Sequence, residues 1–137
     1  MPFITATDLH VSILADELNQ IVRNDTTLIS MAISAAEAEM RSYLYDSYDV
    51  DTIFSQTGED RHALLVRHCV DIAVYGIVAA TQAGQDLDDR KARYDRAIAW
   101  LKMVMKMGTY ADLPTRPATE QVHIQSGNAW TKRNNHY

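Results

Sequence analysis

The sequence is poor in cysteine, proline and glycine, with one, three and five of these residues among 137. Cys69 has no partner for an internal disulfide, and zinc sites built from several cysteines are excluded. So few glycines and prolines exclude collagen-like and glycine-rich architectures. No apolar run approaches the roughly 20 residues that span a bilayer, and the N-terminus lacks the basic region and apolar core of a signal peptide. We therefore expect a soluble protein in a reducing compartment, or in a particle assembled there.

The charge of the chain is unevenly distributed. Residues 1–57 carry nine acidic and two basic side chains, a net charge of −7, whereas residues 58–137 carry nine acidic and eleven basic ones, a net charge of +2. A chain of this length forms a single domain, so the two signs are expected on opposite faces of one body. Opposite faces of opposite charge favour head-to-tail self-association. The alternative is that long helices solvate themselves with mixed charge.

Three amphipathic segments are long enough to form the main helices of an all-α fold. They cover about residues 27–45, 59–82 and 88–107, and in each of them apolar residues recur every three or four positions. The second segment has two adjacent apolar stripes, which is too wide for a surface helix, so we expect it to be central and most buried. Gly108 follows the third segment where a left-handed C-terminal residue belongs. The first helix also carries small residues that let another helix approach closely: Ala32, Ala35, Ala36 and Ala38.

Shorter elements are predicted around these three helices. One or two short helices are expected within residues 5–23, and the first opens on Thr5-x-x-Asp8, the spacing of a capping box. Asn24-Asp25-Thr26 is predicted to be a turn that caps the first long helix. The acidic stretch 46–57 is predicted to be a loop, and Thr57-x-x-Asp60 repeats the capping-box spacing before the central helix.

The chain changes character after Gly108, which predicts a helical domain over residues 1–108 and an extended C-terminal arm over residues 109–137. The two prolines within residues 113–117 exclude a helix there, and residues 121–125 alternate apolar and polar side chains like a short strand. Large apolar residues are too few in the arm to offset the cost of ordering it alone. We therefore expect it to dock on a partner through Val122, Ile124, Trp130, Lys132, Arg133 and Tyr137.

No catalytic or cofactor-binding motif is present, so we expect a protein that is not an enzyme and holds neither cofactor nor metal. The sequence contains no HExxH, P-loop, GxGxxG or GxSxG pattern. His62 and His68 are six residues apart, which places them on different sides of a helix. The three aspartates of residues 46–51 lack the spacing of an EF-hand, which favours a solvated acidic loop. Cys69 is interpreted as a small buried hydrophobic residue.

The most basic segment lies in the third long helix. Arg90, Arg93 and Arg96 fall on one side of it and are interleaved with aspartates. Contact with nucleic-acid phosphates, contact with a subunit or partner, and a solvated helix face all fit this segment. Tyrosine and tryptophan are common at interfaces because they combine apolar area with a polar tip, although the tyrosines fit a core equally well. The predicted subunit interface comprises Arg90, Arg93, Arg96, Trp100, Tyr45 and Tyr48.

Four segments resemble a known family in their order and small-residue pattern. They are Thr5-Ala6-Thr7-Asp8-Leu9, residues 32–44 (AISAAEAEMRSYL), residues 64–77 (LLVRHCVDIAVYGI) and residues 93–107 (RYDRAIAWLKMVMKM). Over about residues 4–108 the chain is similar to the small all-helical head–tail connector (adaptor) proteins of tailed bacteriophages, including Mu-like phage proteins of that type. One departure is the stretch 53–60, which lacks the proline expected before the central helix.

The resemblance implies a structural protein of the virion, located at the head–tail junction and assembled in the host cytoplasm. Such connectors form a ring of about twelve copies beneath the portal of a DNA-filled head. DNA passes through the ring without sequence-specific binding. The C-terminal segment reaches the portal protein, and the opposite end receives a stopper or tail-completion protein. The resemblance implies no cofactor and no membrane.

Two functions of other classes remain open at this point. A small helical DNA-binding or regulatory module would use the segment from Arg90 to Arg96 for recognition. An enzyme would need a pocket that gathers His10, His62 or His68 with carboxylates. The acidic total suits a DNA conduit better than a DNA-binding domain, because a lumen that held phosphates tightly would slow the moving genome.

Overall fold

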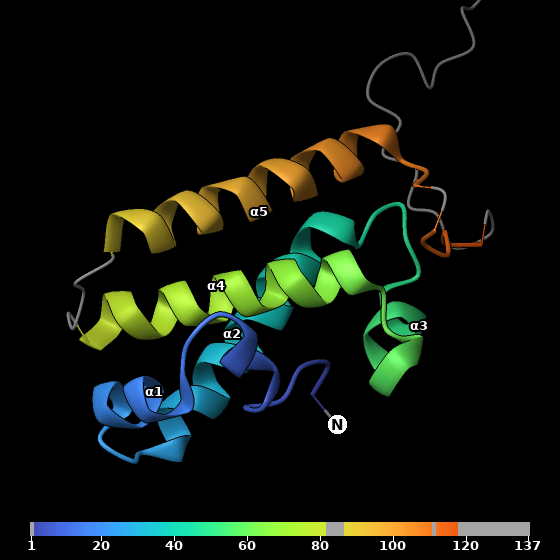
Figure 1. Cartoon of the computed structure of the whole chain (residues 1–137). Helices are drawn as coiled ribbons and strands as arrows, with labels where there is room; N and C mark the ends of the chain where they lie inside the picture. The colour runs from blue at the N-terminus through green and yellow to red at the C-terminus, as the bar shows by residue number, and fades with distance from the viewer. Residues whose placement is uncertain (1, 82–86, 111, 118–137) are drawn as a thin grey trace, which may run out of the picture.

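The computed structural model describes residues 2–81, 87–110 and 112–117, and these residues form the predicted all-α fold. Three long helices make up the bundle: α2 (Thr26–Leu44), α4 (Ala63–Thr81) and α5 (Leu87–Met107). Each runs antiparallel to the one before it (Figure 1). α4 packs against α2 on one side and against α5 on the other. The prediction of three long helices is confirmed, with α2 and α5 each beginning one residue earlier than expected.

The N-terminal elements are short, as predicted. They are the 3-10 helix η1 (Asp8–Val11) and the helix α1 (Ala15–Val22). At the start of η1 the backbone N–H of Thr5 donates to the Asp8 carboxylate at 2.7 Å, which is one half of a capping box. Asp25 caps α2 by accepting from the N–H of Thr27 at 2.9 Å.

The region before α4 differs from the prediction in two respects. The expected loop over residues 46–57 contains the helix α3 (Val50–Ser55), which is capped by Asp49 and buries Ile53 and Phe54. The central helix does not start at Glu59. A 3-10 turn, η2 (Gly58–Asp60), is followed by Arg61 in an extended conformation, and the Thr57 side chain makes no capping hydrogen bond.

Arg61 explains the late start of α4. Its extended backbone lets the guanidinium reach back to the N-terminal segment, where it donates to the Phe3 carbonyl at 2.9 Å and to the Asp8 carboxylate at 2.8 Å. The pair holds the pKa of the Asp8 carboxyl below its usual range, chiefly through this hydrogen bond. A helical Arg61 would give up these contacts, which join sequence positions 53 and 58 residues apart.

The central helix is the most buried, as predicted. Nine of the 19 residues of α4 are buried, including Ile72, Val74 and Ile77. By length and composition alone α4 could cross a membrane, contrary to the sequence expectation, but half of that apolar window is buried within the bundle. A core helix of a soluble protein has the same composition, so this similarity adds no argument for a membrane.

The first residues after α5 fold back onto the bundle. Gly108 adopts a left-handed conformation with φ 69°, as predicted for the end of a helix. Leu113 is buried, Thr115 pairs with Tyr48 as an isolated β-bridge, and the N–H of Arg116 donates to the Ser47 carbonyl at 3.0 Å. The six residues of the predicted docking arm, Val122, Ile124, Trp130, Lys132, Arg133 and Tyr137, lie outside the described residues. The division into residues 1–108 and 109–137 therefore stays a prediction.

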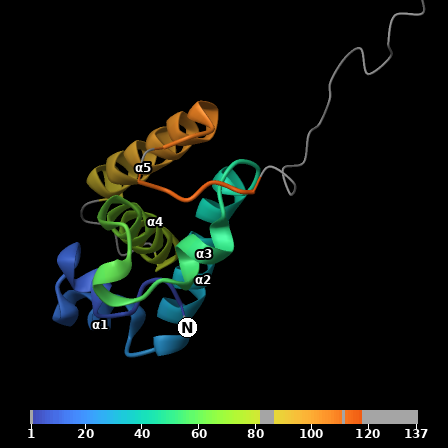
Figure 2. The ribbon, with the colours of Figure 1, turned by 90° about the vertical axis from the view of Figure 1, so that its right-hand side faces the viewer.

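The bundle has two opposite sides that matter for the argument below. α5 lies along one side, and the N-terminal segment lies on the opposite side against α2, in both views (Figures 1 and 2). α4 separates the two.

Candidate subunit-interaction surfaces

Two of the three predicted interface arginines hold the bundle together. Arg90 donates to both the backbone carbonyl and the hydroxyl of Ser12, each at 2.8 Å. Arg93 donates to the same hydroxyl at 3.3 Å and pairs with Asp89 at 3.2 Å. These contacts tie α5 to the turn between η1 and α1, so Arg90 and Arg93 have a place within their own chain.

Arg96 lines an open groove on the same side of α5. The groove encloses about 670 Å³ between η1, α4 and α5, with Val66 and Val70 at its base and arginines around it. We call it the arginine groove and define it by Arg67, Arg93 and Arg96. Arg67 and Arg96 are exposed and make no ion pair among the residues that the structure describes. Sequence reasoning missed Arg67, because the arginine comes from the neighbouring helix.

Asp71 is the half-buried carboxylate of the arginine groove. Burial raises the pKa of Asp71, and Arg93, Arg67 and Arg96 oppose that effect. None of these arginines comes within ion-pair distance of it. The lining of the arginine groove thus balances its three arginines against three aspartates, Asp8, Asp71 and Asp89.

The aromatic residues of the predicted interface occupy three different environments. Trp100 is half-buried, with its ring 4.8 Å from that of His68 and 5.6 Å from that of Tyr110. Tyr45 is 51% exposed, and the Arg116 guanidinium lies 4.5 Å from its ring centre. Tyr48 is fully buried, and its hydroxyl donates to the Val104 carbonyl at 2.8 Å. We therefore correct the prediction for Tyr48: it is a core residue, because its hydroxyl finds a partner inside the bundle.

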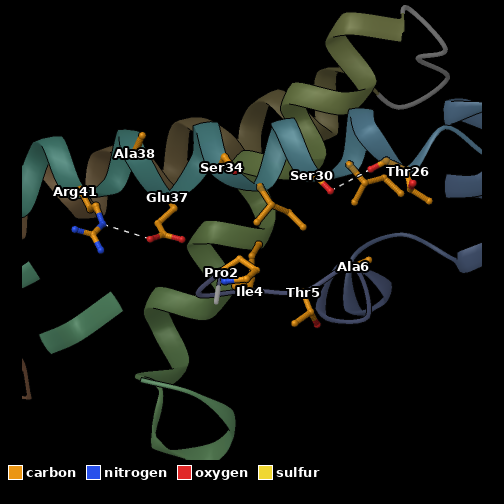
Figure 3. Close-up of a pocket in the computed structure, with 12 residues that line it drawn as sticks. Pro2, Ile4, Thr5, Ala6, Thr26, Ser30, Ser34, Glu37, Ala38 and Arg41 are labelled. Carbon is orange, nitrogen blue, oxygen red and sulfur yellow. Dashed lines mark hydrogen bonds and ion pairs between the residues drawn. The ribbon is translucent and has the colours of Figure 1, made fainter. Parts of the chain in front are cut away.

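A second groove lies on the opposite side of the bundle, between the N-terminal segment and α2 (Figure 3). We call it the α2 groove; it encloses about 610 Å³. Buried Ile4, Ile29 and Ile33 contribute its apolar base. Small exposed side chains follow each other every four residues along its α2 edge: Thr26, Ser30, Ser34 and Ala38.

One end of the α2 groove is charged. Glu37 accepts from Arg41 at 3.3 Å (Figure 3). It also accepts from the backbone N–H of Phe3 at 3.1 Å, which fixes the N-terminal segment against α2. Arg41 also pairs with Asp51 of α3 at 3.1 Å. Every lining residue belongs to the N-terminal part of the chain, whose net charge is −7.

The outer face of α5 carries exposed methionines. Met103 is 46% exposed and Met107 is 54% exposed, and with Ala99 they form a row in which each residue is four positions from the next. Such residues share one helix face. Lys102 and Lys106 are exposed beside this row. Sequence reasoning found the alanines of α2 but not this face, because only the observed burial separates exposed methionines from buried ones.

No catalytic constellation emerges among the described residues. They include no group of three His, Cys, Asp or Glu side chains that could hold a metal ion. His62 lies 3.8 Å from Asp112, whereas His68 is buried against Trp100. Cys69 is fully buried, as predicted, and burial raises the pKa of its thiol to about 12.

Comparison with known proteins identifies one family. A family model described as "Bacteriophage Mu, Gp36" matches residues 3–126, most of the chain. No curated protein and no solved structure matches.

Proposed function

The chain belongs to the bacteriophage Mu Gp36 family, and from that membership we propose that it is a structural protein of the phage head–tail connector. In this proposal copies of the chain form a closed ring between the portal and the stopper or tail-completion protein, and DNA passes through the ring. The chain is not an enzyme and needs no cofactor. Its place is the head–tail junction of the virion.

The observation that carries the proposal is that two opposite sides of the bundle differ in charge and in shape. The basic helix α5 lies on one side of the bundle, and the N-terminal segment with the α2 groove lies on the other (Figure 2); residues 1–57, which include that segment and α2, have a net charge of −7. A ring requires two different faces, because each copy contacts one neighbour with each of them. In a ring of many copies these faces are nearly opposite, which is the arrangement described.

The arm is assigned to the portal. Residues 118–137 follow a segment that the bundle already holds through Leu113, Thr115 and Arg116. An arm of 20 residues spans up to about 70 Å when extended. Its apolar residues Val122, Ile124 and Trp130 need a partner surface, because the arm is too polar to bury them alone.

The test uses phage particles whose only copy of the protein carries a tag. We expect the tag at the head–tail junction by electron microscopy, and a ring there in images of the particles. A chain that lacks residues 119–137 should keep its melting temperature, because no described contact is removed, and should be missing from the particles. A tag found on the head or on the tail fibres would contradict the proposal, and normal incorporation of the shortened chain would contradict the role of the arm.

A further inference from the structure

We propose that the methionine row of α5 in one copy inserts into the α2 groove of the next copy. The inference rests on the proposed ring and names the surfaces that would join its subunits. The occupant of the α2 groove is thus a second copy of this chain, presented through Met103 and Met107. The argument uses the spacing of the two helices, their charges and their positions in the bundle.

The two helix surfaces match in spacing. Helices pack when a ridge of side chains four residues apart on one fits between the ridges of the other. Ala99, Met103 and Met107 form such a ridge, and Met103 and Met107 are about 6 Å apart along the helix axis. On α2 the row of small residues from Ser30 to Ala38 has the same period, and its short side chains leave room for a ridge.

The chemistry of the two surfaces also matches. Methionine is flexible and polarisable, so it fills apolar hollows of irregular shape, such as the base formed by Ile4, Ile29 and Ile33. Exposed, these methionines leave apolar surface in water without contributing to the core. The charged side chains at the end of the α2 groove are Glu37 and Arg41, with Asp51 paired to Arg41 beside them, a net charge of −1, whereas Lys102 and Lys106 flank the methionine row. The docked copies would therefore attract each other around the apolar contact.

The positions of the surfaces allow a ring to close. The methionine row is on the solvent-exposed face of α5, and the α2 groove lies at the N-terminal segment, which is on the opposite side of α4 from α5 (Figure 1). One copy can thus bind a neighbour at each surface at the same time. If the two surfaces were adjacent on one copy, a neighbour bound at one of them would block the other.

The test is a disulfide between engineered cysteines in the full chain. Four double variants combine Met103→Cys or Met107→Cys with Ser30→Cys or Ser34→Cys, all exposed positions. A disulfide needs Cα atoms about 4.4–6.8 Å apart, so it reports direct contact. Cys69 is buried and does not react in the folded chain. Under mild oxidation we expect at least one double variant to give a ladder of cross-linked multimers on a non-reducing gel.

The control pairs Ser34→Cys with Lys91→Cys, an exposed position on the same helix about 18 Å from Met103 along the axis. This pair and each single variant should give no ladder. The mass of the assembly that the chain forms in solution before oxidation distinguishes the proposed ring from the proposed groove contact. If the chain forms multimers in solution but none of the four double variants cross-links, the groove contact is wrong and the proposed ring still stands. If the chain is monomeric in solution, both proposals are wrong.

Discussion

Tyr48 shows what a single hydroxyl group does in this core. Its side chain is fully enclosed, and its hydroxyl is the donor that links the turn after α2 to the Val104 carbonyl of α5. In the sequence this residue lies in an acidic stretch, which predicts a solvent-exposed position. Burial of a tyrosine requires a partner for its hydroxyl, and here the partner comes from a residue 56 positions away.

We predict that Tyr48→Phe lowers the free energy of unfolding by about 1 kcal/mol, the usual net value of one intramolecular hydrogen bond. The ring still fills its site, so the loss comes from the hydroxyl alone. Urea denaturation followed by circular dichroism measures it. The matched control is Tyr45→Phe, at an exposed position, which should change stability by less than about 0.5 kcal/mol. Equal effects of the two substitutions would contradict the role given to Tyr48.

His68 is a buried titratable residue of the helical core. It is 6% exposed, and neither ring nitrogen has a hydrogen-bond partner among the described residues. Burial, and then the nearby Arg67, Arg96 and His62, lower the pKa of His68 to about 4. The imidazole is therefore neutral in the folded protein at neutral pH, where it packs on Trp100 as an apolar ring.

The lowered pKa makes stability depend on pH. Between about pH 6.5 and pH 4 the unfolded chain binds a proton at His68 that the folded chain does not, so the stability fully present above pH 6.5 is lost as the pH falls. We predict that His68→Phe, which keeps a ring against Trp100, removes about 1–3 kcal/mol of this loss. Unfolding free energies of both proteins at pH 7 and pH 4.5 measure the difference. Parallel pH profiles of the two proteins would contradict a lowered pKa of His68 in the folded state.

At the scale of elements, the long helices could be predicted and the connections could not. The periodicity of α2 and the side chain of Asp25 mark the helix and its first residue, because both act locally. The start of α4 depends on Arg61 and on its partners Phe3 and Asp8, which are more than 50 residues away. The six residues of α3 are too few to show a period, and burial of Ile53 and Phe54 stabilises them.

The same distinction applies to the candidate surfaces. The basic side of α5 could be predicted, because Arg93 and Arg96 are close in sequence. The sequence could not show that Arg93 binds within its own chain whereas Arg96 is exposed, because the difference depends on Ser12, which follows η1. The α2 groove needs the N-terminal segment as its second wall, and no local pattern shows where that segment lies.

α4 is the element on which the bundle depends. Ile72 and Ile77 are 5% and 3% exposed on a helix that contacts both other long helices. We predict that Ile72→Ala or Ile77→Ala costs about 2–5 kcal/mol, the range for such truncations in a core. Leu64→Ala on the same helix, at a position 37% exposed, should cost clearly less. Thermal melts that rank Leu64 above the two isoleucines would mean that another surface of α4 forms the core.

At the scale of the whole molecule, charge should tune association more than folding. Lys102 lies beside the methionine row and Lys91 lies near the start of the same helix, so Lys102→Glu and Lys91→Glu change the net charge equally. We predict that Lys102→Glu weakens association by about threefold to tenfold at low salt, the effect of a charge at the rim of an interface. Lys91→Glu should weaken it less. Sedimentation at two salt concentrations measures both; equal losses would indicate an effect of net charge alone.

The bonds that fix the N-terminal segment also set an order of events during protein synthesis. Residues 2–12 are synthesised before their partners Arg61 and Arg90, which are 53 and 78 residues further along the chain from Asp8 and Ser12. Closing loops of this length costs more chain entropy than forming a turn of helix, because the entropic cost rises with the number of residues in the loop. The N-terminal wall of the α2 groove can bind Glu37 once α2 has formed, but its contact with Arg61 needs the chain to be complete to that residue, and Ser12 gains its partner only when Arg90 has been made. In the proposed ring, a chain that ends before α5 would lack both the Arg90 contact and the methionine row with which to bind a neighbour.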